Sequence, residues 1–192
     1  MSAPAPKPRR ATYDDLCRVP DTMLAQIVDG ELHVQPQPAI PHQQVASVLG
    51  MDLGGPFHRG RGGPGGWWIL DEPELHLGED VLVPDLAGWR RERLPELPRE
   101  PAMTLAPDWL CEVLSPSSAV LDRVRKMPIY AAHHVEHVWL VDPMTRTLEV
   151  FRVEGAAWLR LCAYADTGMV RAPPFEAVEL DLGALWPAPA GT

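Results

Sequence analysis

Two apolar segments, residues 108–114 (DWLCEVL) and 137–143 (HVWLVDP), place the strongest constraint on the fold. Each is a short apolar run bounded by turn residues or proline, which is the pattern of a buried β-strand. A helix is expected between them, from about residue 119 to 132. The order of strand, helix and strand predicts a mixed α/β layer, with one sheet covered by helices.

Shorter elements are expected on either side of this unit. Thr12 is a candidate N-cap for a short helix, and Asp29-Gly30 predicts a hairpin turn between two apolar runs. A second helix is expected over 42–57, where Gly54, Gly55 and Pro56 end it, followed by a loop at 59–66. Four prolines exclude a helix from 90–107. Further strands are expected at 67–70, 74–77 and 81–89, and a closing antiparallel meander at 147–155, 157–165 and 178–182.

The length of 192 residues suits one domain, predicted for residues 12–186 between a Pro-rich, basic, flexible leader (1–11) and a tail (187–192). No apolar run approaches the roughly 18 residues that a membrane span requires. The leader has no apolar stretch and therefore does not resemble a secretory signal, so a cytoplasmic location is expected. Three widely spaced cysteines, Cys17, Cys111 and Cys162, favour buried free thiols.

The formal net charge of −9 weighs against a dedicated high-affinity DNA-binding protein, because phosphate contacts with Lys and Arg supply much of that affinity. The charge does not exclude a nuclease, since carboxylates that bind metal ions also lower the net charge. Basic residues gather at 7–10, 90–93 and 123–126. Each group is also compatible with a solvated face.

Two carboxylates lie within apolar runs. Asp85 lies in VLVPDLAGW and Glu112 in DWLCEVLSP. A carboxylate among Val, Leu and Trp is costly to desolvate unless a partner compensates its charge. Mg²⁺ prefers oxygen ligands of this kind. Strand alternation would instead turn both side chains toward water, and the residue pattern alone leaves both interpretations open.

The predicted helix after Glu112 carries Asp122, Lys126 and Tyr130 at four-residue intervals, so the three share one helical face. Lys126 follows Glu112 by one strand-to-helix connection and is a candidate for the same site. A lysine near a metal-bound water helps to deprotonate it or stabilises charge on a phosphate. By itself, the spacing favours a surface ion pair between Asp122 and Lys126.

Taken together, six motifs resemble the Uma-type restriction endonuclease family, in the family's order and over residues 12–186. The resemblance implies a PD-(D/E)XK nuclease fold, in which a mixed central β-sheet is flanked by α-helices. The motifs are IVDGEL (27–32), PHQQV (41–45), VPDLAGW (83–89), APDWLCEVLSPSS (106–118), D-x-x-x-K-x-x-x-Y (122–130) and HVWLVDP (137–143).

The resemblance also implies an active site. Asp85 is then the Asp of the Pro-Asp signature, and Glu112 is the second ligand of Mg²⁺ or Mn²⁺. Leu114 occupies the usual lysine position, so Lys126 is expected to take the lysine's role. The backbone carbonyl of Val113 is implied as a further metal ligand.

Supporting roles are assigned to Gln26, Glu31, His42, Asp122 and Tyr130. Gln26 departs from the family, which commonly has Glu there; the amide keeps a carbonyl oxygen but loses a negative charge. Glu31 belongs to the hairpin, where it is structural or compensates for Gln26. His42 is expected either to contact phosphate or to cap the helix.

Other candidates are weaker. His133, Glu136 and His137 suggest zinc, but a solvated turn between helix and strand explains them better. Ser115, Ser117 and Ser118 are expected to cap the following helix and not to act as nucleophiles.

The sequence therefore predicts a metal-dependent DNA endonuclease that hydrolyses phosphodiester bonds. The alternative from another class is a nuclease-fold nucleic-acid-binding protein that has lost cleavage, and a third is an enzyme that acts on another phosphate ester. DNA is the expected partner, no membrane association is expected, and a homodimer is expected by analogy.

Overall fold

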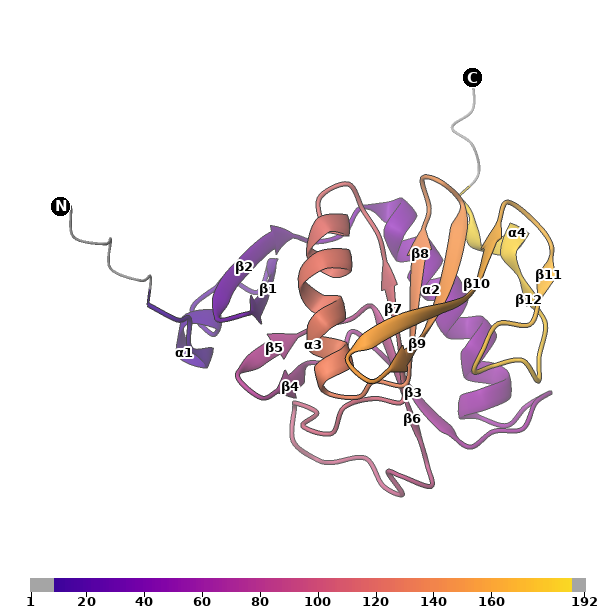
Figure 1. The fold of residues 1–192 in the computed structure, drawn as a ribbon, viewed down its shortest axis with the longest axis horizontal. Helices are drawn as coiled ribbons and strands as arrows, with labels where there is room; N and C mark the ends of the chain where they lie inside the picture. Colours follow the sequence, from indigo (N-terminus) through magenta and orange to yellow (C-terminus); the bar gives the residue numbers. More distant parts are fainter. Residues whose placement is uncertain (1–8, 188–192) are drawn as a thin grey trace.

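The computed structural model describes residues 9–187, which form three β-sheets with helices packed around them (Figure 1). The predictions for residues 1–8 of the leader and 188–192 of the tail lie outside the described residues. At the end of the leader, the N–H of Ala11 donates to the carbonyl of Gly30 at 2.8 Å. This bond joins residue 11 to the first hairpin.

A six-stranded sheet forms the centre, in the order β10-β9-β8-β7-β6-β3. Its central strands β7 and β8 run parallel, and the other pairs are antiparallel. Both central strands are buried along nearly their whole length, as their continuous apolar sequences predict. The strands are β3 (Trp67–Asp71), β6 (Leu86–Arg90), β7 (Trp109–Val113), β8 (His137–Asp142), β9 (Thr147–Glu154) and β10 (Ala157–Ala165).

A four-stranded antiparallel sheet lies beside it, in the order β2-β1-β5-β4. The predicted hairpin is confirmed: Asp29 and Gly30 have φ values of 54° and 77°, and positive φ at both turn residues matches the twist of the flanking strands. A third sheet pairs β11 (Met169–Val170) with β12 (Leu180–Asp181). The four strands are β1 (Met23–Val28), β2 (Glu31–Pro36), β4 (Leu75–Leu77) and β5 (Asp80–Leu82).

The helices mostly follow the predictions. Thr12 caps α1 (Tyr13–Leu16) through a capping box with Asp15. Helix α2 (Ile40–Leu53) continues as a π-helical turn, η1 (Gly54–His58), so the glycines end its α-helical part but not its helical path. The expected helix 119–132 is continuous and contains a π-helical stretch. That stretch is η2 (Leu121–Lys126), followed by α3 (Met127–Ala132), and α4 (Leu182–Leu185) closes the domain.

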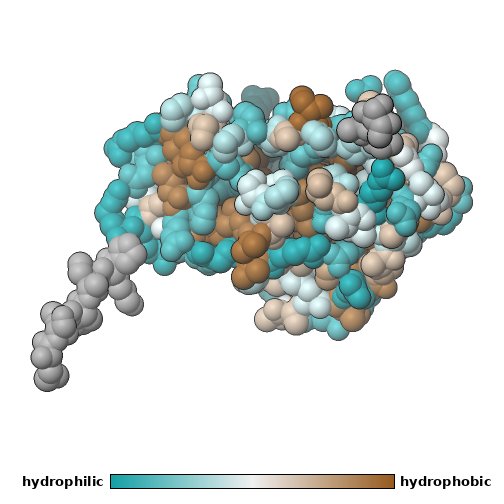
Figure 2. All heavy atoms as spheres, turned by 90° about the horizontal axis from the view of Figure 1, so that it is seen from above, coloured by the Kyte–Doolittle hydropathy of each residue, from teal (hydrophilic) through white to brown (hydrophobic). Residues whose placement is uncertain are grey.

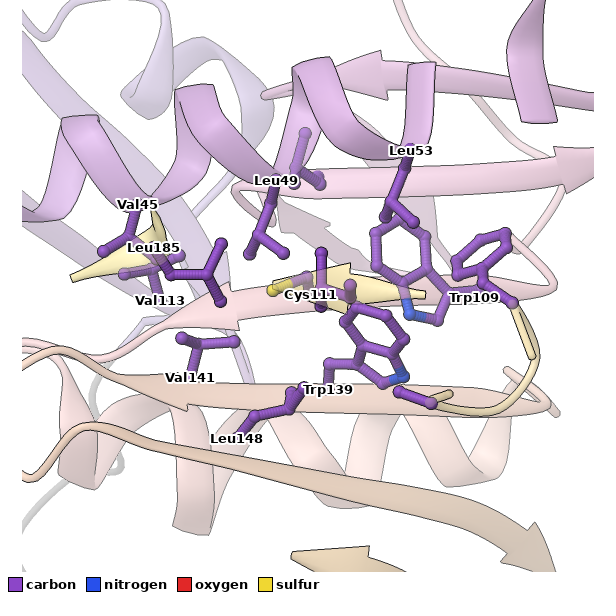
Figure 3. Close-up of a cluster of buried hydrophobic side chains, with 14 of the residues drawn as sticks. Val45, Leu49, Leu53, Trp109, Cys111, Val113, Trp139, Val141, Leu148 and Leu185 are labelled. Carbon is purple, nitrogen blue, oxygen red and sulfur yellow. The ribbon is translucent and has the colours of Figure 1, made fainter. Parts of the chain in front are cut away.

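Apolar side chains pack on both faces of the six-stranded sheet. Val45, Leu49 and Leu53 of α2 lie against alternate residues of β7, Trp109 among them (Figure 3). On the other face, Leu110 belongs to the cluster that contains Met127 and Tyr130. Because β7 alternates between these two clusters, Glu112 faces the side of α3, as Leu110 does.

The expectation of one continuous sheet is wrong. The segment 81–89 was expected to form a single strand, but it divides into β5 and β6, which belong to different sheets. The break falls at residues 83–85, where Pro84 has no N–H to donate. The segment 178–182 is also not part of the meander, because β12 pairs with β11 and not with β10.

The surface shows scattered apolar groups. In Figure 2, hydrophilic side chains surround separate hydrophobic ones on the face shown. The large exposed side chains include Ile40 and Met51 on α2 and Val120 and Val124 on the helix that contains η2 and α3. Such scattered groups are ordinary on protein surfaces. In residues 9–187, no helix has the length and apolarity to cross a membrane.

The cysteines are free as predicted, but only Cys111 is fully buried, and Cys17 is exposed.

Candidate active site

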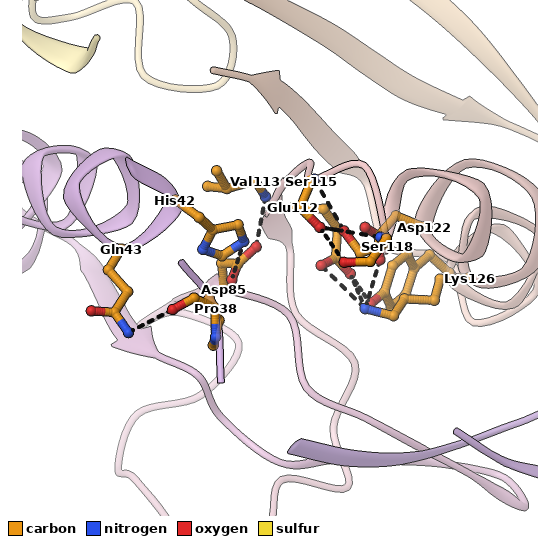
Figure 4. Close-up of polar contacts among 12 residues, drawn as sticks. Pro38, His42, Gln43, Asp85, Glu112, Val113, Ser115, Ser118, Asp122 and Lys126 are labelled. Atoms are coloured by element: carbon orange, nitrogen blue, oxygen red, sulfur yellow. Dashed lines mark hydrogen bonds and ion pairs between the residues drawn. The ribbon is translucent and has the colours of Figure 1, made fainter. Parts of the chain in front are cut away.

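Asp85 lies in the bend between β5 and β6, not within a strand as expected. Its Oδ2 accepts a hydrogen bond from the backbone N–H of Val113 at 2.6 Å (Figure 4). This bond holds the carboxylate beside the end of β7, next to Glu112. The break at Pro84 therefore positions Asp85, because it turns the chain from one sheet into the other at this point.

Glu112 is 3% exposed and faces the helix formed by η2 and α3. Lys126 Nζ lies 3.2 Å from its Oε1 and 3.3 Å from its Oε2. The Tyr130 hydroxyl donates to the same Oε1 at 2.5 Å. The structure thus brings together Glu112, Lys126 and Tyr130, although they come from different elements.

The predicted pairing of Asp122 with Lys126 is present, with 2.9 Å between Oδ1 and Nζ. Its expected location at the surface is wrong, because the two side chains are only 2% and 3% exposed. Both residues face the sheet, so the pair is enclosed with Glu112. Within residues 9–187, Asp122 Oδ1 has no partner with hydrogen-bond geometry despite its closeness to Nζ.

The electrostatics follow from this burial. The pKa of Glu112 is raised to about 8, chiefly by burial. The charge of Lys126 lowers this pKa, and the charges of Asp122 and Asp85 raise it further. Burial works to lower the pKa of Lys126, but the charges of Glu112 and Asp122 outweigh it, and the pKa is raised. Lys126 is therefore held as an ammonium ion at neutral pH.

His42 faces Asp85 from the first turn of α2, with 3.3 Å between Nε2 and Oδ1. The capping role is wrong, because Ala39 is the N-cap of α2 and no side chain caps it. Burial works to lower the pKa of His42, but its contacts with Asp85 and the Val113 backbone raise it above the usual value. Its Nδ1 is buried and has no hydrogen-bond partner in the part of the chain that the structure describes.

Gln26 and Glu31 have different surroundings. Gln26 is 1% exposed, and its Oε1 accepts from the backbone N–H of Val83 at 2.9 Å. That carbonyl oxygen is therefore already engaged. The Glu31 side chain is 59% exposed and pairs with Arg125 at 3.2 Å. Glu31 is not among the residues that line the cavity beside Asp85.

Two adjoining hollows lie at this site. A cavity of about 320 Å³ is lined by Gln26, Asp85, Glu112 and Lys126, together with the Ser115–Ser118 turn. A groove of about 870 Å³ runs along α2. His42 and Asp85 line both. In the turn, the N–H of Ser118 donates to Ser115 Oγ at 3.1 Å, in agreement with the expected capping role.

The donor set suits an oxygen-preferring divalent cation. The carboxylates of Asp85, Glu112 and Asp122 face a single lysine, so negative charge exceeds the nearby ammonium charge. Within residues 9–187, no three His, Cys, Asp or Glu side chains are arranged to hold a metal ion together. Backbone oxygen or water would therefore complete the coordination of a cation held by Asp85 and Glu112.

Glu72 is a site neighbour that the sequence did not reveal. Its N–H donates to the carbonyl of Asp85 at 3.0 Å, and its φ of 45° is unusual for a residue other than glycine. Burial and the charge of Asp85 raise its pKa. Only the pairing of β3 with β6, which sets Asp71 opposite Leu86, brings it to the site.

Comparison with known proteins agrees with this fold. The structure resembles the crystal structure of a protein described as a "putative nuclease belonging to DUF820" from Anabaena variabilis ATCC 29413. The TM-score is 0.67 at 21% sequence identity, and the match covers 92% of this chain and 97% of that one. No curated protein matches the sequence. The family model "Uma2: Putative restriction endonuclease" matches residues 10–183. The chain therefore belongs to the Uma2 family and has the restriction endonuclease-like fold that its sequence motifs predicted.

Proposed function

We propose that this protein is a metal-dependent endonuclease that hydrolyses phosphodiester bonds in DNA, with Asp85, Glu112 and Lys126 as its catalytic residues. The observation that carries the proposal is the buried contact between Glu112 and Lys126, which lines the same cavity as Asp85. Burial of an ammonium ion and carboxylates costs free energy. Such a cost is typical of a site that serves chemistry.

Mg²⁺ or Mn²⁺ is the proposed cofactor, held by the carboxylates of Asp85 and Glu112 and by the backbone carbonyl of Val113. When bound, such a cation polarises the phosphate and lowers the pKa of a coordinated water. The hydrogen bond from the Val113 N–H fixes the orientation of Asp85. Tyr130 and Lys126 fix Glu112 in the same way.

Lys126 acts through its charge in this proposal. Because its pKa is raised, it keeps its proton and does not serve as a general base near neutral pH. An ammonium ion at the wall of a buried cavity stabilises the negative charge that develops on the phosphate oxygens. Asp122 holds the ammonium group in place at 2.9 Å.

One observation favours the alternative, a nuclease-fold protein that binds nucleic acid without cutting it. Gln26 lines the cavity where an acidic residue would supplement the metal site, and its Oε1 already accepts from Val83. The fold would persist in such a protein, but metal affinity would be weakened.

Nicking of supercoiled plasmid with Mg²⁺ or Mn²⁺ tests the proposal. We expect cleavage that EDTA abolishes and that falls by about 100-fold or more in Asp85→Asn and in Glu112→Gln. Glu79→Gln is the matched control, because this carboxylate is 78% exposed and forms a surface ion pair with Arg10. Cleavage that survives both substitutions would contradict the proposed site.

Two further measurements separate the alternatives. Absence of cleavage, together with DNA binding that weakens as salt rises, would support the binding protein. Cleavage of bis(p-nitrophenyl) phosphate without cleavage of DNA would support an enzyme that acts on another phosphate ester. The homodimer expected by analogy stays a prediction, which light scattering coupled to size exclusion measures.

A further inference from the structure

The groove beside the candidate site has two walls that converge on the catalytic cavity. Helix α2 and the turn η1 supply one wall, and β3 with the following residues supplies the other. The groove joins the cavity at His42 and Asp85, which line both. A ligand in the groove would therefore lie next to anything bound between Asp85 and Glu112.

Contacts between the walls give the direction of the groove. At the catalytic end, His42 lies 3.3 Å from Asp85. At the far end, the ring of His58 contacts the backbone of Ile69 at 3.1 Å. From residue 42 to 58 the helical wall extends roughly 24 Å, at 1.5 Å per residue. Along the axis of a DNA duplex, where the phosphates of one strand rise 3.4 Å each, this length covers roughly seven nucleotides.

Two arginines stand at the far end. Arg59 and Arg61 line the groove and are exposed. Neither takes part in any ion pair or side-chain hydrogen bond within the described part of the chain, unlike most other arginines there. Their guanidinium groups are therefore available to a ligand.

The segment that carries these arginines is held in a defined conformation. The N–H groups of Arg59 and Arg61 donate to the carbonyls of Gly54 and Gly55 at 3.0 and 2.9 Å. Gly63 packs so closely on Pro56 that a Cβ atom would lie 2.4 Å from the proline Cβ. The backbone is thus fixed against η1 before any ligand arrives, which reduces the entropy cost of binding.

Charge is distributed unequally along the groove. Asp71, Glu72 and Asp85 line it toward the catalytic end, and Arg59 and Arg61 line it at the other. Gly54 lies between the ends, and a Cβ atom added there would meet nothing within 4 Å. A polyanion fits this pattern when a cation screens the acidic end and the arginines bind phosphates farther along.

We propose that this groove binds the sugar–phosphate backbone of a nucleic-acid strand that leads into the active site, with Arg59 and Arg61 as phosphate contacts several nucleotides from the cleaved bond. This inference rests on the proposed function and deepens it. It assigns the enzyme a polymeric substrate that is recognised along the strand. A mononucleotide would be too short to reach both the arginines and the carboxylates.

The first test measures binding of fluorescent DNA oligonucleotides of 4 to 16 nucleotides to the full chain, with phosphorothioate linkages to prevent cleavage and with a fixed concentration of Mg²⁺ to screen the acidic end of the groove. For the native protein, affinity rises with length until the groove is covered. In Arg59→Gln/Arg61→Gln, we expect the affinity for the longest oligonucleotide to fall roughly tenfold or more. The logarithm of the association constant falls as the logarithm of the salt concentration rises. The steepness of this fall should decrease by about 1.4 to 1.8 for two lost phosphate contacts.

Arg99→Gln/Arg160→Gln is the matched control, because it removes the same charge from exposed residues that do not line the groove. An equal loss of affinity in this control would show that net charge alone explains the effect, and it would overturn the proposal. An unchanged length dependence in Arg59→Gln/Arg61→Gln would overturn it as well.

A second variant fills the groove without removing charge. Gly54→Gln adds a side chain where the backbone has φ −63° and ψ −40° and a Cβ meets open space. Folding should therefore be maintained, or slightly improved by the gain in helix propensity. We expect weaker binding of long oligonucleotides with no loss of melting temperature. Full binding by a stably folded Gly54→Gln would contradict strand passage through the groove.

Failure of this inference is distinguishable from failure of the proposed function. Length-dependent binding that requires Arg59 and Arg61, without plasmid nicking, would retain the groove and reject the endonuclease. Metal-dependent nicking by Arg59→Gln/Arg61→Gln at the native rate on long and short substrates would retain the endonuclease and reject the groove.

Discussion

Tyr130 and Glu112 form a 2.5 Å hydrogen bond inside the protein, between a completely buried hydroxyl and a carboxylate that is 3% exposed. The bond joins α3 to β7 at the centre of the six-stranded sheet. It also fixes one oxygen of a proposed metal ligand. The structural and the chemical roles of this contact are therefore coupled.

Tyr130→Phe should lower the free energy of unfolding by about 1–3 kcal/mol, because it leaves a buried oxygen of Glu112 without this hydrogen-bond donor. The aromatic ring and its packing are retained, so the effect comes from the hydroxyl. Urea denaturation followed by tryptophan fluorescence measures it. Tyr164→Phe is the control, since that hydroxyl lies at the surface, where it donates to the Arg171 carbonyl at 3.3 Å. Equal losses in the two variants would contradict a special role for the buried bond.

Lys126→Met should be strongly destabilising, by about 3–5 kcal/mol, because it leaves Glu112 and Asp122 buried without a cation. Arg125→Met, one position earlier, removes ion pairs with Asp29 and Glu31, whose side chains are more than half exposed. It should cost about 0–1 kcal/mol. Thermal and urea unfolding of the two variants provide the comparison. The double variant Lys126→Met/Glu112→Gln should recover part of the loss, and no recovery would contradict the charge argument.

The stability of the fold should fall as the pH drops below about 6.5, in part because of His137. Burial lowers the pKa of this 6% exposed imidazole, so the unfolded chain binds a proton that the folded chain does not. His137→Gln should therefore flatten the dependence of melting temperature on pH. The effect is expected between the lowered pKa of His137 in the folded protein and pH 6.5, the ordinary pKa of histidine. His133→Gln is the control, because the His133 side chain lies in the turn after α3. A variant curve parallel to the native one would be inconsistent with this assignment.

Much of the fold was predictable because its signals are local. The apolar runs of β7 and β8 and the helix between them have the expected bounds to within two residues. Asp29-Gly30 fixed the hairpin through the positive φ that this turn requires. The four-residue spacing also placed Lys126 and Tyr130 on one helical face, and in the structure this face contacts Glu112.

The missed features depend on contacts between distant segments. The change of sheet at Pro84 requires β5 to pair with β1, and this pairing is invisible within the local pattern 81–89. The burial of Asp122 with Lys126 depends on how the helix sits on the sheet. A pair at four-residue spacing looks the same in sequence whether it faces water or the core.

Gln26 offers the sharpest test of metal binding. In Gln26→Glu, the new carboxylate can still accept from the Val83 N–H, as the amide oxygen does at 2.9 Å. It adds a negative charge to the wall of the cavity that contains Asp85 and Glu112. We therefore expect Mn²⁺ affinity, measured by calorimetry, to rise roughly tenfold, since ligand charge tunes the affinity of such sites.

Gln44→Glu is the matched control, because it adds the same charge to an exposed position of α2 that does not line the cavity. The same substitution separates the two proposed functions. One outcome is that the native protein fails to cut plasmid while Gln26→Glu cuts it. In that outcome, the missing carboxylate at position 26 explains why a protein with a nuclease fold binds nucleic acid without cutting it. If Mn²⁺ affinity is the same in Gln26→Glu and Gln44→Glu, the cation does not bind beside Gln26. The ligands would then have to be sought elsewhere than at Asp85 and Glu112.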